Sequence, residues 1–319
     1  MFDVKSMVNR IVAGDGRAIA RALTILENLD DGSDLLREAL YPYRGKAHVV
    51  GITGSPGAGK SSLVDGLIDV AKEGNRRIGI LAVDPSSPFG GGALLGDRVR
   101  MGRHSGDDKV YIRSVGSRSG SGGLSPAVLD MLLPLQASGC EVIVVETVGA
   151  GQSELDVMHV ADTVVLVLTP GAGDAIQTAK AGIMEIADVF VVNKADLAGA
   201  TALVHDLEYL LMARQDVQNP GWSPPIVLTS AISGSGVTQL WVAIREHLAN
   251  AKKSGQFESR RSDIAMRSLV GKTAGTYRAL VEDYLRLHPE WLAQLSTEGP
   301  SRALASRLLR ETVRADILH

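Results

Sequence analysis

The sequence predicts a doubly wound, mostly parallel α/β fold with helical extensions at both ends. Three observations predict it: a glycine-rich loop that follows an apolar run at residues 49–52, further short apolar runs along the chain, and helical patterns between those runs. The runs are rich in β-branched residues and continuous, as in strands buried on both faces of a parallel sheet. Ligands of such sheets bind at the carboxyl ends of the strands.

The predicted strands share this short, apolar, β-branched character and cover residues 48–53, 77–83, 141–145, 163–168, 188–192 and 226–229. A more polar run at residues 110–115 predicts an edge strand. Ser125 followed by Pro126 predicts the start of a helix, because serine caps helices and proline suits the first helical position.

Both ends of the chain read as helical. Residues 1–44 carry two amphipathic patterns, with Ser33 predicted to cap the second, and should pack on the main domain or on a partner subunit. Residues 251–259 resemble a linker, and helical stretches follow at 260–287 and 289–318. We therefore expect a helical extension (1–44), a central domain (45–250) and a helical arm (251–319) for dimerisation or docking, or for extra packing on the same domain.

Composition excludes several classes of protein. The 319 residues are 45% hydrophobic, enough for a sizeable core, and the net charge of −3 predicts no nucleic-acid partner. The sequence contains no apolar run of about eighteen residues, and its N-terminus lacks the apolar core of a signal peptide. One cysteine, Cys140, cannot form an internal disulfide. These features predict a soluble cytoplasmic protein that does not bind membranes.

The loop after residues 49–52 fits the phosphate-binding pattern G-x-x-x-x-G-K-[ST] through Gly54, Gly59, Lys60 and Ser61. Glycines let the backbone turn its N–H groups toward phosphate oxygens, and the following helix adds the partial positive charge of its N-terminus. Lys60 would approach the β- and γ-phosphates, and the Ser61 hydroxyl would bind Mg²⁺. The sequence therefore predicts nucleotide binding.

A second motif concerns the base. Residues 193–196, Asn-Lys-Ala-Asp, directly follow a predicted strand and match the N-K-x-D guanine reader of GTPases. Asp196 can accept from guanine N1–H and from the exocyclic amine together, a donor pair that adenine does not present. Lys194 would lie along the base and Asn193 would brace the loop. Ser230 and Ala231 match a further base-contacting loop.

Acidic residues predict a magnesium environment. Glu146 and Gly149 stand where most GTPases carry D-x-x-G, and a carboxylate at a strand end facing the phosphate loop suits Mg²⁺. Gln152 lies three residues beyond that glycine, so unaided hydrolysis should be slow. Asp84 and Asp97 flank a glycine-rich segment typical of a nucleotide-sensing switch. Asp84 could instead shape a turn.

Together, GSPGAGKSS, VDPSSPFGGGALLGDRVRM, ETVGAGQSE and NKAD resemble the MeaB/ArgK-like family of P-loop GTPases. The resemblance implies phosphate binding by Gly54, Ser55, Pro56, Gly57, Ala58, Gly59, Lys60, Ser61 and Ser62. It implies base binding by Asn193, Lys194, Asp196, Ser230, Ala231 and Ile232. It implies a Mg²⁺ environment of Ser61, Asp84, Asp97 and Glu146. The catalytic candidates are Lys60, Glu146, Gly149 and Gln152. Gln177 and Lys180 fall in a segment similar to an additional switch of the family.

The resemblance also implies a function: a GTP-hydrolysing chaperone, homodimeric through its C-terminal helices, that gates adenosylcobalamin loading and protection or reactivation of methylmalonyl-CoA mutase. Two alternatives remain open. One is a metal-delivery GTPase, although the seven histidines show no tight cluster and Cys140 is alone. The other is a P-loop kinase, which would have little use for a guanine reader.

Overall fold

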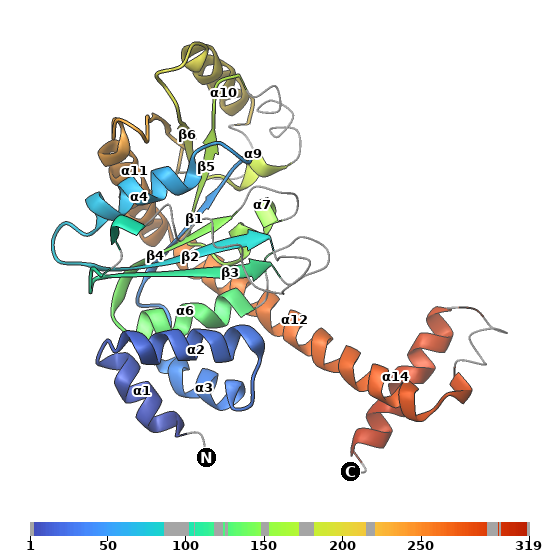
Figure 1. The fold of residues 1–319 in the computed structure, drawn as a ribbon. Coiled ribbons are helices and arrows are strands. Elements are labelled where there is room, and N and C mark those ends of the chain that lie inside the picture. Colours follow the sequence, from blue (N-terminus) through green and yellow to red (C-terminus); the bar gives the residue numbers. More distant parts are fainter. Residues whose placement is uncertain are drawn as a thin grey trace. The chain divides into compact units, whose positions relative to one another are not determined.

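The computed structural model describes residues 3–85, 102–104, 106–117, 124, 127–147, 153–171, 182–214, 221–291, 299 and 301–317. Within these residues, seven strands form one parallel sheet in the order β3-β2-β4-β1-β5-β6-β7 (Figure 1). The strands are β1 (His48–Thr53), β2 (Arg77–Pro85), β3 (Val110–Ser117), β4 (Cys140–Thr147), β5 (Thr163–Leu168), β6 (Val189–Val192) and β7 (Ile226–Leu228). The predicted doubly wound fold is confirmed, and β3 is the predicted edge strand.

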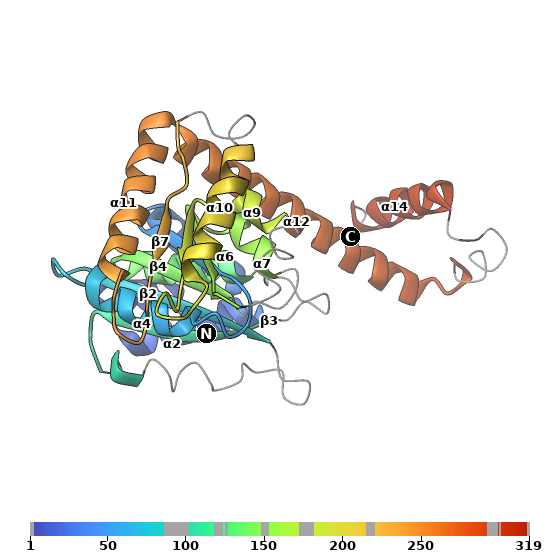
Figure 2. The ribbon, with the colours of Figure 1, turned by 90° about the horizontal axis from the view of Figure 1, so that it is seen from above.

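Helices of the compact unit of residues 1–262 cover both faces of this sheet (Figure 2). The described helices of the chain are α1 (Val4–Val12), α2 (Gly16–Asn28), α3 (Ser33–Leu40), α4 (Lys60–Ala71), α6 (Ala127–Ala137), α7 (Ser153–Asp156), α9 (Ile183–Ile186), α10 (Ala200–Arg214), α11 (Val237–Ser254), α12 (Gln256–Leu287) and α14 (Arg302–Ile317). Short 3-10 turns occur at Tyr41–Tyr43, Gly102–His104 and Val157–His159. The predicted helix start at Ser125 and Pro126 lies outside the described residues.

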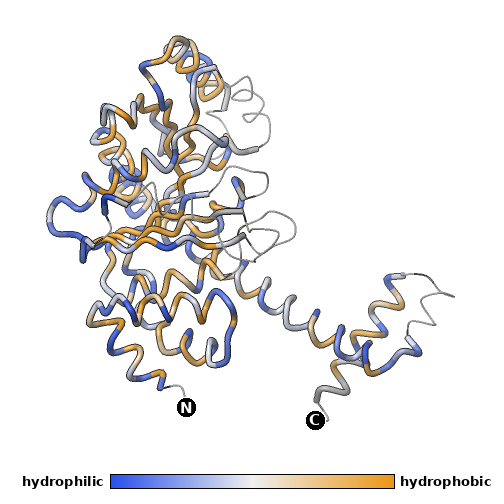
Figure 3. Tube along the Cα trace, viewed as in Figure 1, coloured by the Kyte–Doolittle hydropathy of each residue, from blue (hydrophilic) through white to orange (hydrophobic). Residues whose placement is uncertain are grey.

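The core lies on both sides of the sheet. On one side α4 and α11 pack against the strands through Leu63, Leu67 and Leu240, and on the other α6 packs through Met131 and Leu135. Strands β1, β5 and β6 are buried along their whole length, which explains their continuous apolar sequences. Figure 3 shows this apolar centre as orange tube.

The N-terminal helices pack on the central domain, one of the two positions expected from the sequence. Their buried residues share one core cluster with α6 and with β2, β3 and β4. Arg113 of the edge strand β3 donates to Glu27 of α2 at 2.8 Å, and Arg37 of α3 pairs with Asp130 of α6 at 2.8 Å. The predicted cap at Ser33 is wrong: Gly32 is the N-cap residue, in the left-handed region at φ 85°, and Ser33 opens the helix.

The chain divides into two compact units, residues 1–262 and 263–319. The predicted linker at residues 251–259 is wrong, because α11 runs to Ser254 and α12 begins at Gln256, with Gly255 alone between them at φ 77°. Gly255 has no Cβ and takes this left-handed turn without strain, so one residue replaces the expected linker. Among the described helices, none is long and apolar enough to cross a membrane.

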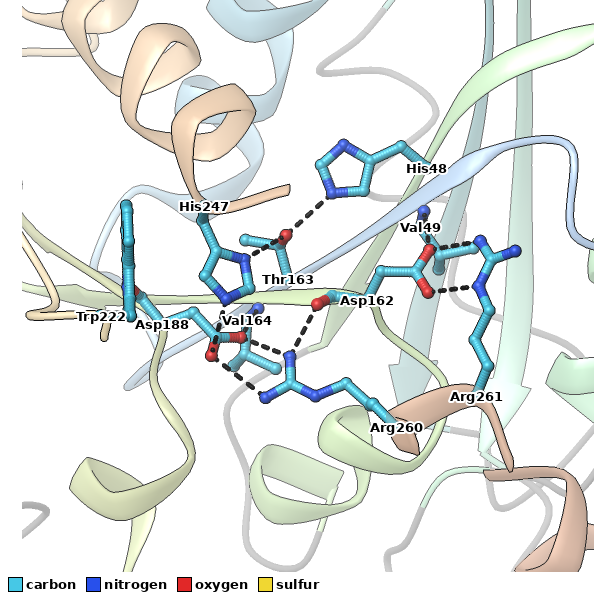
Figure 4. Close-up of polar contacts among 10 residues, drawn as sticks. All are labelled: His48, Val49, Asp162, Thr163, Val164, Asp188, Trp222, His247, Arg260 and Arg261. Atoms are coloured by element: carbon cyan, nitrogen blue, oxygen red, sulfur yellow. Dashed lines mark hydrogen bonds and ion pairs between the residues drawn. The ribbon is translucent and has the colours of Figure 1, made fainter. Parts of the chain in front are cut away.

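A buried polar cluster lies at the amino ends of β1, β5 and β6 (Figure 4). The Thr163 hydroxyl lies 2.8 Å from Nε2 of His48 and 2.8 Å from Nδ1 of His247. Burial lowers the pKa of His48 to about 4; the charge of Asp162 opposes this shift, and the neighbouring His247 and Arg261 reinforce it. His48 is therefore neutral in the folded protein at neutral pH.

The low pKa of His48 predicts acid sensitivity. An unfolded histidine takes up a proton near pH 6.5, whereas folded His48 does so only near pH 4, so the free energy of unfolding should fall as the pH drops through that window. The slope is at most about 1.4 kcal/mol per pH unit. When the free energy of unfolding is measured with urea at several pH values in this range, it should change less steeply with pH for His48→Gln than for the wild type. The exposed control His205→Gln should keep the wild-type slope, and an unchanged slope in His48→Gln would contradict this assignment.

Candidate functional site

The phosphate-binding pattern forms the loop between β1 and α4, at the carboxyl edge of the sheet. Gly54, Gly57 and Gly59 all have positive φ, at 139°, 76° and 85°. A Cβ on Gly54 would stand 2.1 Å from the Val167 carbonyl oxygen, and a Cβ on Gly59 would stand 2.4 Å from Asn193 Nδ2. Two of these glycines are therefore required by close approach as well as by backbone conformation.

Helix α4 begins inside this motif. Its N-cap is Gly59, which makes no side-chain capping hydrogen bond, so the first N–H groups of the helix lie beside the loop without a side-chain cap. Lys60 is buried, and its Nζ donates to the carbonyl oxygens of Gly54 at 2.6 Å and Ser55 at 3.0 Å. This arrangement of amides, helix N-terminus and ammonium suits a chain of phosphates. Ala58 is buried, whereas Pro56 and Ser62 are exposed.

The magnesium candidates Ser61 and Glu146 meet directly. The Ser61 hydroxyl donates to Glu146 Oε1 at 2.6 Å, and both side chains are buried. Adjacent oxygen ligands of an octahedral Mg²⁺ at its usual bond length lie about 2.9 Å apart, so a shift of a few tenths of an ångström would suit the ion. The two hard oxygen donors therefore fit Mg²⁺. Glu146 lies within the last residues of β4, which runs two residues further than the sequence predicted.

Asn193 joins the base-reading loop to the phosphate loop. Its Nδ2 donates to the Ala58 carbonyl oxygen at 2.8 Å, and its Oδ1 accepts from the Thr229 hydroxyl at 3.1 Å and the Ala231 N–H at 3.2 Å. Lys194, at φ 56°, adds a second link, because its Nζ donates to the Gly57 carbonyl oxygen at 2.8 Å. These links hold the two predicted motifs in one site, as the bracing role of Asn193 requires.

Asp196 stands exposed at the end of this loop. A hydrogen bond from the Ser230 side chain, with backbone hydrogen bonding and the nearby Lys194, lowers its pKa. It is therefore an ionised, acceptor-only group near neutral pH, which matches the donor pair of guanine. The Ser230 N–H donates to the Ser235 carbonyl oxygen at 3.0 Å, and Ile232 between them is 96% exposed.

Several predicted residues are not placed. Asp97, Gly149 and Gln152 lie outside the described residues, as do Gln177 and Lys180. Asp84 pairs with Gly116 in the ladder between β2 and β3, but its side chain is outside the description. Within the described part of the chain, no group of three or more histidine, cysteine, aspartate or glutamate residues is arranged to hold a metal ion.

The sequence analysis did not single out one charged residue near the phosphate-binding loop. Glu154 of α7 is half-buried, and burial raises its pKa, although the charge of Lys60 opposes the shift. Its carbonyl oxygen accepts from the Thr53 hydroxyl at 3.3 Å, and Thr53 in turn accepts from Thr147 at 3.0 Å. Its position two residues after Gln152, in the ETVGAGQSE stretch, is the sequence feature that could have identified Glu154 as a candidate.

The family model described as "Methylmalonyl Co-A mutase-associated GTPase MeaB" matches residues 19–281. A relative from Pyrococcus horikoshii, also named as a GTPase, is 49% identical over 262 residues and covers 82% of this chain and 83% of its own. GTPase ArgK of Escherichia coli is 32% identical over 276 residues, with 83% and 82% covered. The crystal structure of a LAO/AO transport system kinase matches with a TM-score of 0.71 and 26% identity, covering 98% of this chain and 99% of its own.

The steric test of the loop uses two glycines with different surroundings. Gly54→Ala should lower the free energy of unfolding by about 3 kcal/mol, because its Cβ would meet a backbone carbonyl that cannot move aside. Gly57→Ala should cost only about 1 kcal/mol, because no protein atom lies within 4 Å of its Cβ position. Urea unfolding without nucleotide measures both. Equal losses would contradict the close approach of β5 to Gly54.

Proposed function

The chain belongs to the family of methylmalonyl-CoA mutase-associated GTPases, and we propose that it is a chaperone that uses GTP to gate adenosylcobalamin loading, and protection or reactivation, of a methylmalonyl-CoA mutase. It is a GTPase and binds guanine nucleotide. The observation that carries the nucleotide part is the bond from Asn193 to Ala58, which joins the base-reading loop to the phosphate loop. The mutase part is supported by the family description alone.

We assign the chemistry to the chain's own groups. Lys60 and the N–H groups around Gly59 bind and orient the phosphates, and Asp196 selects guanine. Ser61 and Glu146 would hold Mg²⁺, which supplies charge neutralisation on the phosphate oxygens when bound. Asp84 and Asp97 stay proposed members of that environment. Gly149 and Gln152 stay proposed for γ-phosphate sensing and water positioning.

The mutase assignment is tested by GTP turnover. GTP hydrolysis by the purified protein should be slow and should rise by at least about tenfold when a methylmalonyl-CoA mutase from the same cell is added, as for GTPases whose partners complete the site. Ser61→Ala should lose most of this turnover. ATP should not support it at the same concentration.

Two outcomes would change the assignment. If turnover is unchanged and the two proteins do not associate with any nucleotide, the mutase proposal fails while the GTPase function stands. If ATP is preferred and its phosphate appears on an acceptor, the chain is a kinase, the activity for which its structural relative is named.

We also propose that residues 251–319 form a dimerisation arm on a GTPase domain of residues 45–250. Helix α12 contains no buried residue, and apolar side chains on it are largely exposed: Met266, Leu269 and Val270 at 66%, 67% and 63%. An exposed apolar surface of this kind favours association with another chain. Trp291 and Leu304, further along the arm, are buried.

Dimerisation predicts a change of mass on substitution. Leu269→Glu combined with Val270→Glu should convert a dimer to a monomer, because two charges would be buried in the proposed interface. Size-exclusion chromatography with light scattering measures the mass. Arg267→Glu, an exposed position on the same helix, should leave the dimer intact. A wild-type protein that is already monomeric would sink this proposal.

A further inference from the structure

We propose that the second turn of α12 couples the C-terminal unit to the nucleotide site through Arg260 and Arg261, which hold the amino ends of the strands that carry the nucleotide loops. The inference needs only the GTPase function, and does not depend on which partner the protein has. Its basis is the polar cluster drawn in Figure 4.

Arg260 fastens α12 to β5 and β6. Its Nη1 and Nη2 donate to the two carboxylate oxygens of Asp188 at 2.6 and 3.1 Å, and Nη1 also donates to the Asp162 carbonyl oxygen at 2.6 Å. The same Asp188 carboxylate accepts the Val164 N–H of β5 at 2.8 Å. One carboxylate just before β6 therefore ties the helix to two neighbouring strands.

Arg261 fastens the same turn to β1 and β5. Its Nε and Nη2 donate to the Asp162 carboxylate at 2.7 and 2.8 Å, and Asp162 accepts the Val49 N–H at 2.8 Å. Nη1 and Nη2 also donate to the carbonyl oxygens of Gly45 and Ala47 at 2.7 and 2.8 Å. The segment that enters β1 is thus held by a single guanidinium group.

Helix α11 joins the same cluster. His247 Nε2 lies 3.2 Å from Asp188 Oδ1, and its Nδ1 contacts the Thr163 hydroxyl at the start of β5. Trp222 donates to the Asp188 carbonyl oxygen at 2.8 Å and packs edge-on against the His247 ring. Asp188 is 3% and Asp162 4% exposed, so these contacts lie in the interior, where geometry is strongly constrained.

The opposite ends of these three strands form the nucleotide site. Strand β1 leads into Gly54, and β6 leads into Asn193. Strand β5 lies between them: its Leu168 carbonyl oxygen accepts the Asn193 N–H at 2.8 Å, and its Val167 carbonyl faces Gly54. A displacement of residues 256–262, the root of α12, would therefore strain the strands on which both loops are built, because a close-packed interior transmits strain.

Helix α12 continues from this root into the C-terminal unit, since it spans Gln256–Leu287 and the units divide after residue 262. A partner bound to residues 263–319 would act on the same continuous helix. Linkage makes such coupling reciprocal, so nucleotide binding must also alter the root. This reciprocity separates coupling from a clamp that only stabilises the fold.

Hydrogen exchange on the full-length wild-type protein tests the reciprocity directly. Backbone exchange in residues 256–262 should differ between the GDP-bound and GTPγS-bound states with Mg²⁺, while α1 serves as an internal reference that does not change. Identical exchange in residues 256–262 without nucleotide, with GDP and with GTPγS would overturn the proposal. This experiment needs no variant.

Variants identify the residues that carry the coupling. Arg260→Gln and Arg261→Gln should weaken GTPγS binding by about fivefold or more, the lower end of ordinary coupling, and abolish the exchange difference at saturating nucleotide. Arg260→Lys keeps the charge but not the paired hydrogen bonds, so it should keep part of the exchange difference that Arg260→Gln loses. The exposed control Arg267→Gln should behave as wild type. A full exchange difference in folded Arg260→Gln would overturn the role of Arg260, and if that variant does not fold, the wild-type experiment decides alone.

Discussion

Burial of β1, β5 and β6 on both faces governs where this chain can place polar chemistry. Every residue of these strands is buried, and their backbone groups are paired with neighbouring strands in parallel ladders. Charged side chains are accommodated only at the strand ends. The two ends are used differently, and the functional properties of the molecule follow from that difference.

At the amino ends the protein neutralises its own charges. Burial alone would raise the pKa of Asp188, but hydrogen bonds and charge from His247 and Arg260 outweigh it and leave the pKa lowered. A buried carboxylate is tolerated only with such complete pairing. At the carboxyl ends the chain instead presents a helix N-terminus capped by Gly59 and an exposed, ionised Asp196. At the amino edge the buried charges are paired within the protein, whereas the carboxyl edge offers groups that suit a charged nucleotide.

The sequence predicted the parts whose signal is local. Continuous apolar runs located the strands, and the phosphate loop and Asn193 were recognised because each motif occupies a few consecutive residues after a strand. Arg260 and Asp188 were not linked, because they are 72 residues apart and no periodicity connects them. Their partnership arises only when the sheet brings strand starts and the α12 root together. The carboxyl ends of β2, β3 and β4 were predicted two residues short, because residues 84–85, 116–117 and 146–147 leave the apolar pattern of the strands.

The mistaken linker shows how much depends on a single residue between two helices. A polar stretch such as residues 251–259 reads as flexible, and a flexible linker would isolate whatever follows it from the nucleotide domain. In the structure that stretch is helical except at Gly255, so α12 leaves α11 through a single turn. Because α11 is fixed on the sheet by Leu240 and Ile244, and the next turn is fixed by its arginines, the root has little freedom of its own. Its position is therefore determined by the strands, which is the condition that coupling through it requires.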